Sequence, residues 1–178
     1  MPRLFTALEV PPPVALALSF LRGGLPGARW IDPENYHITL SFIGDIDDAL
    51  ARDIAEALEG VRRRSINIEI DGLGAFGGAR PRALYARVEP SDALVELQGA
   101  QERLLRRLGA SPENRQYTPH VTLARLRGEA TARMTADWLA LRGGLRQSFT
   151  SARFVLMSSR NSVGGGPYVV EEAYDLDQ

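Results

Sequence analysis

Histidine occurs only twice in the 178-residue sequence, and both copies begin nearly the same tetrapeptide. His37 opens His-Ile-Thr-Leu and His120 opens His-Val-Thr-Leu. Each histidine is therefore followed two positions later by a threonine, Thr39 in the first copy and Thr122 in the second. Imidazole titrates near neutral pH and can give or accept a proton, which makes this pair a candidate acid and base. The copies lie 83 residues apart, close to half of the chain, which predicts two related lobes with one copy each.

Both tetrapeptides lie in segments whose apolar residues alternate, as in a β-strand. Side chains at positions i and i+2 of a strand share one face, so each histidine is expected beside its threonine on a polar face. In the first segment the apolar face is expected to hold Tyr36, Ile38, Leu40 and Phe42. The polar face is expected to hold His37, Thr39 and Ser41. If the lobes face each other, two imidazoles and two hydroxyls converge.

Two imidazoles on opposite sides of a substrate suit in-line attack at phosphorus. A neutral ring takes a proton from water, while a protonated ring gives one to the departing oxygen. The hydroxyls of Thr39 and Thr122 can hold non-bridging oxygens as their charge grows. Arg125, at or just beyond the end of the second strand, is the candidate cation for the phosphate. This scheme needs no metal or other cofactor, and neither histidine has the spacing of a common metal motif.

Strands and helices must position these groups, and the sequence indicates both. We expect strands at 3–10, 36–43, 65–73, 83–89, 118–124, 149–158 and 168–174. Helices are expected at 14–22, 47–60, 91–108 and 129–141, with Ser91 as an N-cap. The elements mix without regular βαβ alternation, which predicts an α+β fold with an antiparallel sheet. Trp30 and Trp138 are expected to be packing residues, and Gly164 to Gly166 a hairpin turn rather than a phosphate cradle.

Composition excludes several classes of enzyme. Cysteine is absent, so disulfides, thiolate nucleophiles and cysteine-ligated metal centres are excluded. All 21 basic residues are arginine, which excludes a Schiff-base lysine, a Walker phosphate loop and a lysyl-nucleotide intermediate. The net charge of −1 argues against a global field for extended nucleic-acid binding, so any such substrate must be held locally. No apolar run is long enough for a membrane span, and we expect a cytoplasmic monomer.

The sequence resembles the 2H phosphoesterase superfamily, which is defined by two His-x-Thr/Ser-x motifs. Within it, the chain is similar to the bacterial and archaeal RNA 2′,3′-cyclic phosphodiesterases, also called 2′-5′ RNA ligases. The similarity extends over nearly the whole chain. The segments that carry it are RLFTALEVP, RWIDPENYHITLSFIGD, DGLGAFGGARPRALYARV, PENRQYTPHVTLAR and GGGPYVV.

The resemblance implies one bilobed α+β domain over residues 1–178, with two intertwined lobes related by a pseudo-twofold axis and a central cleft. It implies metal-independent hydrolysis of an RNA 2′,3′-cyclic phosphate to a 2′-phosphate, with reversible 2′-5′ ligation, in which a ribose hydroxyl replaces water, as a weaker activity. By motif order, His37 is the proton donor and His120 the proton acceptor. Thr39, Thr122 and Arg125 would hold the phosphate.

Two aromatic residues are candidates for stacking on the terminal base, Phe76 and Tyr168. An aromatic residue beside glycines is more often a loop anchor. The chain has Phe76-Gly77-Gly78 where many relatives have Phe-Pro, so the loop is expected to be looser and its substrate contacts are in doubt.

Several alternatives remain open. The acid and base roles can be exchanged without changing the residues, and a 3′-phosphate product would argue for that exchange. The substrate can be another cyclic phosphate, such as one on an ADP-ribose derivative, or a 2′-5′ oligoadenylate linkage. A non-catalytic module that binds RNA ends is a further reading. The expected partner is the cyclic-phosphate end of an RNA, and no membrane is expected.

Overall fold

The computed structural model describes residues 3–159 and 166–178, and within these it contains nine strands and four α-helices. The strands are β1 (Arg3–Glu9), β2 (Ala28–Trp30), β3 (His37–Asp45), β4 (Ile66–Phe76), β5 (Ala83–Val88), β6 (His120–Leu126), β7 (Arg146–Ser151), β8 (Arg153–Ser159) and β9 (Tyr168–Asp175). The helices are α1 (Pro12–Ser19), α2 (Asp48–Leu58), α3 (Asp92–Arg107) and α4 (Ala132–Ala140). The predicted α+β class is confirmed.

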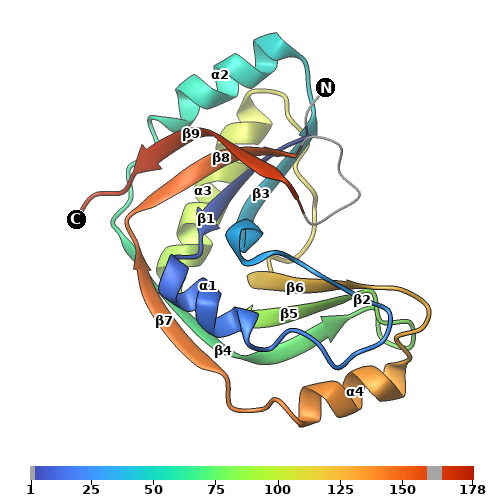
Figure 1. The fold of residues 1–178 in the computed structure, drawn as a ribbon. Coiled ribbons are helices and arrows are strands. Elements are labelled where there is room, and N and C mark those ends of the chain that lie inside the picture. The colour runs from blue at the N-terminus through green and yellow to red at the C-terminus, as the bar shows by residue number, and fades with distance from the viewer. Residues whose placement is uncertain (1–2, 160–165) are drawn as a thin grey trace.

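The strands form one antiparallel sheet, in which four strands of the path lie on each side of the central junction between β6 and β3. The path runs β7-β4-β5-β6-β3-β1-β8-β9, and β2 pairs with β6 off this path. The strands that carry the two histidines, β3 and β6, meet at the centre through a single residue pair, Ile38 with Val121. Figure 1 shows β1, β3, β8 and β9 in one half of the molecule and β4 to β7 in the other. The two motifs therefore lie on either side of the junction between the halves.

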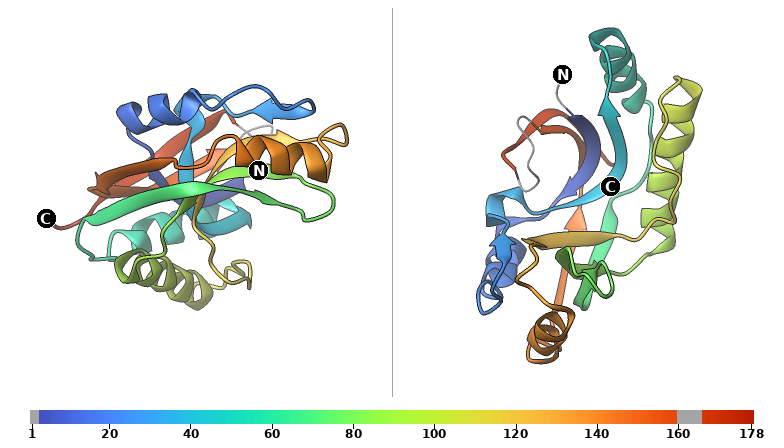
Figure 2. Two further views of the ribbon diagram at one scale, coloured as in Figure 1. Left: turned by 90° about the horizontal axis from the view of Figure 1, so that it is seen from below. Right: turned by 90° about the vertical axis from the view of Figure 1, so that its right-hand side faces the viewer.

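Helices α2, α3 and α4 each begin where a polar side chain accepts a backbone N–H group, whereas α1 begins at a run of prolines without a side-chain cap. Asp47 accepts the N–H of Leu50 at the start of α2, and Thr131 accepts the N–H of Met134 at the start of α4. Ser91 caps α3 as predicted, by accepting the N–H of Leu94. Helices α2 and α3 lie beside each other on one side of the molecule, whereas α1 lies on the opposite side (Figure 2).

Most of the buried apolar side chains form one core that spans both halves of the sheet. It includes Ile38 and Val121 at the junction, Leu94 and Leu97 of α3, and Ile54 of α2. A smaller cluster of Phe5, Ala7, Val155 and Met157 lies between β1 and β8, with Tyr168 packed against it. The larger core therefore joins the two halves where backbone pairing is sparse.

The segment 149–158, expected to be mostly strand, is strand except at Ala152. That residue divides it between β7 and β8, a division that the sequence did not indicate. The physical reason lies in the pairing, because β7 pairs with β4 in one half of the sheet and β8 pairs with β1 in the other. The short strand β2 was not predicted, since three residues are too few to show alternation.

Candidate active site

The two motifs occupy equivalent positions on their strands. In β3 and in β6 the histidine and the threonine two residues later are half-buried, and the residues between and after them are buried in the core. The sharing of one face by each histidine and its threonine is as predicted. The sixth residue of each strand is exposed, Phe42 in β3 and Arg125 in β6.

A β-bulge in each strand explains these exposed sixth residues. The pairing of β1 with β3 slips by one residue at Leu40, and that of β5 with β6 slips at Leu123. An extra residue in a strand reverses the alternation beyond it. The predicted faces of Ser41 and Phe42 were therefore wrong, because Ser41 is buried at 3% exposure and Phe42 is 39% exposed. The same slip turns Arg125, which lies inside β6, toward the histidines rather than toward the core.

Each imidazole is held by a backbone carbonyl from two residues earlier. The Nδ1 atom of His37 lies 2.8 Å from the carbonyl oxygen of Asn35, at the end of the 3₁₀-helix Pro33–Asn35. The Nδ1 atom of His120 lies 2.7 Å from the carbonyl oxygen of Thr118. A carbonyl can only accept, so Nδ1 carries the hydrogen in both rings. The Nε2 atom of each neutral ring is therefore available as a proton acceptor.

An aromatic residue flanks each histidine. The ring of Tyr168 meets that of His37 edge-on at 4.9 Å between centroids, and the ring of Phe76 meets that of His120 in the same way at 4.9 Å. Phe76 also stacks on Tyr85 at 4.2 Å. The loop after Phe76, expected to be looser than in relatives, is closed by the N–H of Arg82 donating to the Phe76 carbonyl at 2.8 Å. Stacking of either ring on a substrate base stays a prediction.

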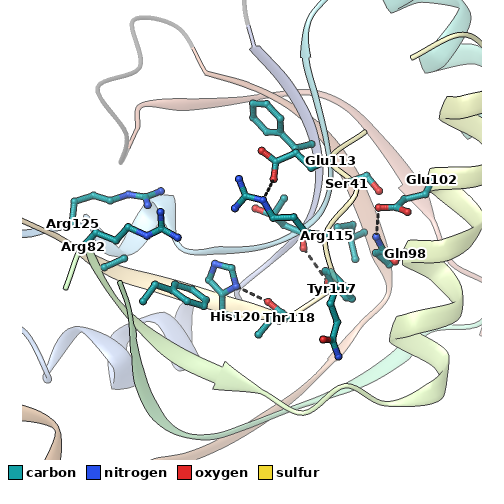
Figure 3. Close-up of a pocket in the computed structure, with 16 residues that line it drawn as sticks. Ser41, Arg82, Gln98, Glu102, Glu113, Arg115, Tyr117, Thr118, His120 and Arg125 are labelled. Carbon is teal, nitrogen blue, oxygen red and sulfur yellow. Dashed lines mark hydrogen bonds and ion pairs between the residues drawn. The ribbon is translucent and has the colours of Figure 1, made fainter. Parts of the chain in front are cut away.

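Two adjoining cavities each reach one of the histidines. The larger, of about 420 Å³, is lined by His120, Phe76 and Arg82 among others (Figure 3). The smaller, of about 210 Å³, is lined by His37 and Tyr168 among others. Both are lined by Thr39, Phe42 and Arg125. The structure thus brings Thr39 and Arg125 between the two histidines, whereas the half-buried Thr122 lines neither cavity.

Burial favours the neutral form of both imidazoles. Burial, with smaller contributions from the charges of His120 and Arg125, lowers the pKa of His37 to about 4, against the opposing effect of its hydrogen bond to Asn35. Burial also lowers the pKa of His120, and the charge of Arg125 adds to that effect. The phosphate of a substrate would act in the opposite direction, because an anion stabilises an imidazolium.

Sequence reasoning missed other residues at this site. Tyr117 lines the larger cavity and donates its hydroxyl to the Thr39 carbonyl at 3.0 Å, which ties the loop before β6 to β3. Tyr85 and Arg82 come from β5 and the loop before it. Tyr117 immediately precedes the Thr-Pro-His run and could have been suspected, but Arg82 and Tyr85 reach the site through strand pairing that no local pattern reports.

Other expectations concern residues away from the site. Trp138 is buried, and its ring lies 5.6 Å from that of Trp30, which confirms both as packing residues. The predicted turn at Gly164 to Gly166 lies for the most part outside the described residues. Within residues 3–159 and 166–178, no helix is long and apolar enough to cross a membrane. In that same part of the chain, no group of three or more His, Asp or Glu side chains is placed to hold a metal ion.

Comparison with known proteins gives one family for the chain. The family model described as LigT like phosphoesterase matches residues 8–85 and again residues 87–168, one motif in each match. An RNA 2′,3′-cyclic phosphodiesterase of Aeropyrum pernix is 39% identical over 112 residues, which cover 62% of this chain and 63% of that protein. One of Aquifex aeolicus is 36% identical over 104 residues, covering 56% and 55%. These alignments span less than two thirds of either relative.

Solved structures with the same fold cover nearly the whole chain. Escherichia coli LigT complexed with 3′-AMP superposes with a TM-score of 0.81 at 22% identity and covers 100% of both chains. The protein TT0787 of Thermus thermophilus superposes with a TM-score of 0.78 at 22% identity and covers 97% of both chains. At these identities the likeness establishes the fold.

Proposed function

The chain belongs to the LigT-like phosphoesterase family, and from that premise we propose that it hydrolyses RNA 2′,3′-cyclic phosphate ends to 2′-phosphates without a metal ion. The observation that carries the proposal is the pair of imidazoles, each with Nδ1 bound to a carbonyl and Nε2 left for the reaction. Arg125 and Thr39 lie between them, where a phosphate would be held. Relatives named as RNA 2′,3′-cyclic phosphodiesterases support the choice of substrate.

In the proposed reaction the two rings act on opposite sides of phosphorus. Neutral His120 takes a proton from water through Nε2 as the water oxygen bonds to phosphorus. The bond from phosphorus to O3′ breaks, and protonated His37 gives its proton to O3′. The hydroxyl of Thr39 and the guanidinium of Arg125, which line both cavities, bind the non-bridging oxygens, whose charge grows in the transition state. The same role for Thr122, which lines neither cavity, rests on the second motif alone. The Nδ1–H bonds to carbonyls stabilise whichever ring carries the positive charge.

The assignment of His37 as acid and His120 as base rests on motif order. The lowered pKa of His37 opposes its role as the acid in the free protein. A general acid must hold its proton at the working pH, while the surroundings of His37 favour its neutral form. The assignment therefore needs the substrate anion to raise the pKa of His37 on binding. If the roles are exchanged, the bond to O2′ breaks and the product is a 3′-phosphate. A ribose 5′-hydroxyl in place of water would give weak 2′-5′ ligation by the same steps.

The test is an assay of a short RNA with a 2′,3′-cyclic phosphate end, with EDTA present, in which 2′- and 3′-phosphate products are resolved. We expect a 2′-phosphate. His37→Ala and His120→Ala should each lower the rate by about 10² to 10⁴, because each removes one proton transfer. Both variants should keep the unfolding midpoint of the parent and still bind the RNA end.

Other outcomes separate the alternatives. Tight binding of the RNA end with no product would identify a non-catalytic module. Faster turnover of a cyclic phosphate on an ADP-ribose derivative, or of a 2′-5′ oligoadenylate, would change the substrate but not the chemistry. Full activity in both histidine variants would overturn the mechanism.

A further inference from the structure

Arg82 is the last residue of the loop between β4 and β5, and its backbone is fixed on both sides. Its N–H donates to the carbonyl of Phe76 at 2.8 Å, and its carbonyl accepts the N–H of Leu126 at 2.9 Å. Gly77 makes this closure possible, because a Cβ there would collide with the carbonyl oxygen of Arg80. The loop therefore holds Arg82 beside the end of β6.

Arg82 and Arg125 are neighbours at one end of the larger cavity. Ala83 pairs with Arg125 across β5 and β6, and adjacent strands lie about 4.8 Å apart. Figure 3 shows the two side chains next to each other, extending toward the same space. In the described part of the chain neither guanidinium has a carboxylate partner, although like charges at close range repel. An anion bound in front of them would relieve that repulsion.

The two arginines differ in their relation to the histidines. Arg125 lines both cavities and lowers the pKa of both imidazoles through its charge. Arg82 lines only the larger cavity and is not among the groups that shift either pKa. Arg125 therefore lies where the reacting phosphate must be, between the imidazoles. Arg82 lies to one side, within reach of a different anionic group.

The far end of the cavity differs because its charges are paired. It is lined by Glu102, which pairs with Arg106 and accepts a hydrogen bond from Gln98, and by Glu113, which pairs with Arg115 (Figure 3). Paired groups of this kind attract a phosphate less than the guanidinium groups of Arg82 and Arg125, which have no carboxylate partner in the described part of the chain. The arginine end is thus the side by which a negatively charged RNA backbone would leave the site.

We propose that Arg82 binds the phosphodiester that joins the terminal nucleotide to the preceding one, so that the protein selects ends of RNA chains over mononucleoside 2′,3′-cyclic phosphates. A guanidinium matches a phosphodiester by paired N–H donors. This inference rests on the proposed function and adds a second phosphate subsite to it.

The experiment compares kcat/KM on three substrates: 2′,3′-cyclic AMP, the dinucleotide ApA with a 2′,3′-cyclic phosphate end, and the same dinucleotide with a neutral methylphosphonate linkage. Arg82→Ala should lower kcat/KM about tenfold on the charged dinucleotide and leave it unchanged on 2′,3′-cyclic AMP. Replacing the charged linkage by methylphosphonate should lower kcat/KM of the parent protein about tenfold. The same replacement should leave kcat/KM of Arg82→Ala unchanged, because that variant has already lost the contact. Arg133→Ala, which removes an exposed charge from α4 outside these cavities, is the matched control and should behave as the parent.

Two results would overturn the inference. An equal loss on the mononucleotide and the dinucleotide would place Arg82 on the reacting phosphate. Unchanged kcat/KM on the charged dinucleotide would leave Arg82 without a role in binding. In both cases the parent protein still forms 2′-phosphate, whereas failure of the proposed function is recognised by a parent protein that turns over none of the three substrates.

Discussion

Each imidazole of the site is oriented by the chain segment that immediately precedes it. The acceptors are the carbonyls of Asn35 and Thr118, two residues before His37 and His120. Because these are main-chain atoms, a histidine at the first position of either strand is held without any distant carboxylate. Both rings therefore expose Nε2, and their difference as acid and base must come from burial and from the charges around them.

The shifted pKa values predict how activity depends on pH. The general base must be neutral, so its contribution to the rate is lost as the pH falls through its pKa. The general acid must be protonated, so its contribution to the rate is lost as the pH rises through its pKa. Both histidine pKa values lie below the ordinary 6.5, that of His37 at about 4. We expect the profile of kcat/KM, which reports the free protein, to have its maximum below pH 6.5. The kcat profile should be displaced to higher pH, because bound phosphate raises both pKa values.

Titration by NMR checks the same pKa values directly, since the chain has only two histidines to assign. The imidazole signal of His37 should have its midpoint near pH 4 and that of His120 below 6.5. Inorganic phosphate should move both midpoints upward. A midpoint of His37 at or above 6.5 in the free protein would contradict this account.

At the level of elements, the bulges in β3 and β6 decide which side chains the site receives. Simple alternation correctly predicts that each histidine shares a face with its threonine. It fails at Ser41 and Phe42, because the bulge at Leu40 depends on β1, a strand about 35 residues away in the sequence. Thr6 of β1 accepts the N–H of Ser41 with its hydroxyl and donates to Gln101 of α3. No pattern within β3 reports such a partner.

Removing that hydroxyl should therefore destabilise the protein. Thr6→Val keeps the shape of the side chain but leaves the buried N–H of Ser41 and the amide oxygen of Gln101 without this partner. We expect the free energy of unfolding to fall by about 2 kcal/mol, measured by denaturant titration. The matched control is Thr135→Val in α4, since the Thr135 hydroxyl is buried with no hydrogen-bond partner in the described part of the chain. That change should be neutral or stabilising, and equal losses in the two variants would refute the role of Thr6.

At the scale of the whole molecule, the repeat in the sequence and the halves of the sheet do not coincide. The spacing of the motifs predicts two related lobes, and the family model matches the chain twice, once on each side of residue 86. In the sheet, however, β4 of the first match lies with β5 to β7, and β8 of the second match lies with β1 and β3. The resemblance implies intertwined lobes, but the residues do not indicate that β4 and β8 are the strands exchanged, because the choice of strand partner depends on contacts far apart in the sequence.

The two histidine strands are joined by one backbone pair and by the Tyr117 hydroxyl bound to the Thr39 carbonyl, so we expect side-chain packing at Ile38 and Val121 to help set the separation of the imidazoles. Ile38→Val and the control Ile54→Val, in α2, each remove one methyl group from a fully buried site. Each should lower the free energy of unfolding by about 1 kcal/mol. Only Ile38→Val should also lower kcat/KM, by about tenfold, because it lets β3 shift against β6 and misplaces one imidazole relative to the other. Equal kcat/KM in the two variants would mean that the core as a whole, and not this pair, fixes the geometry of the site.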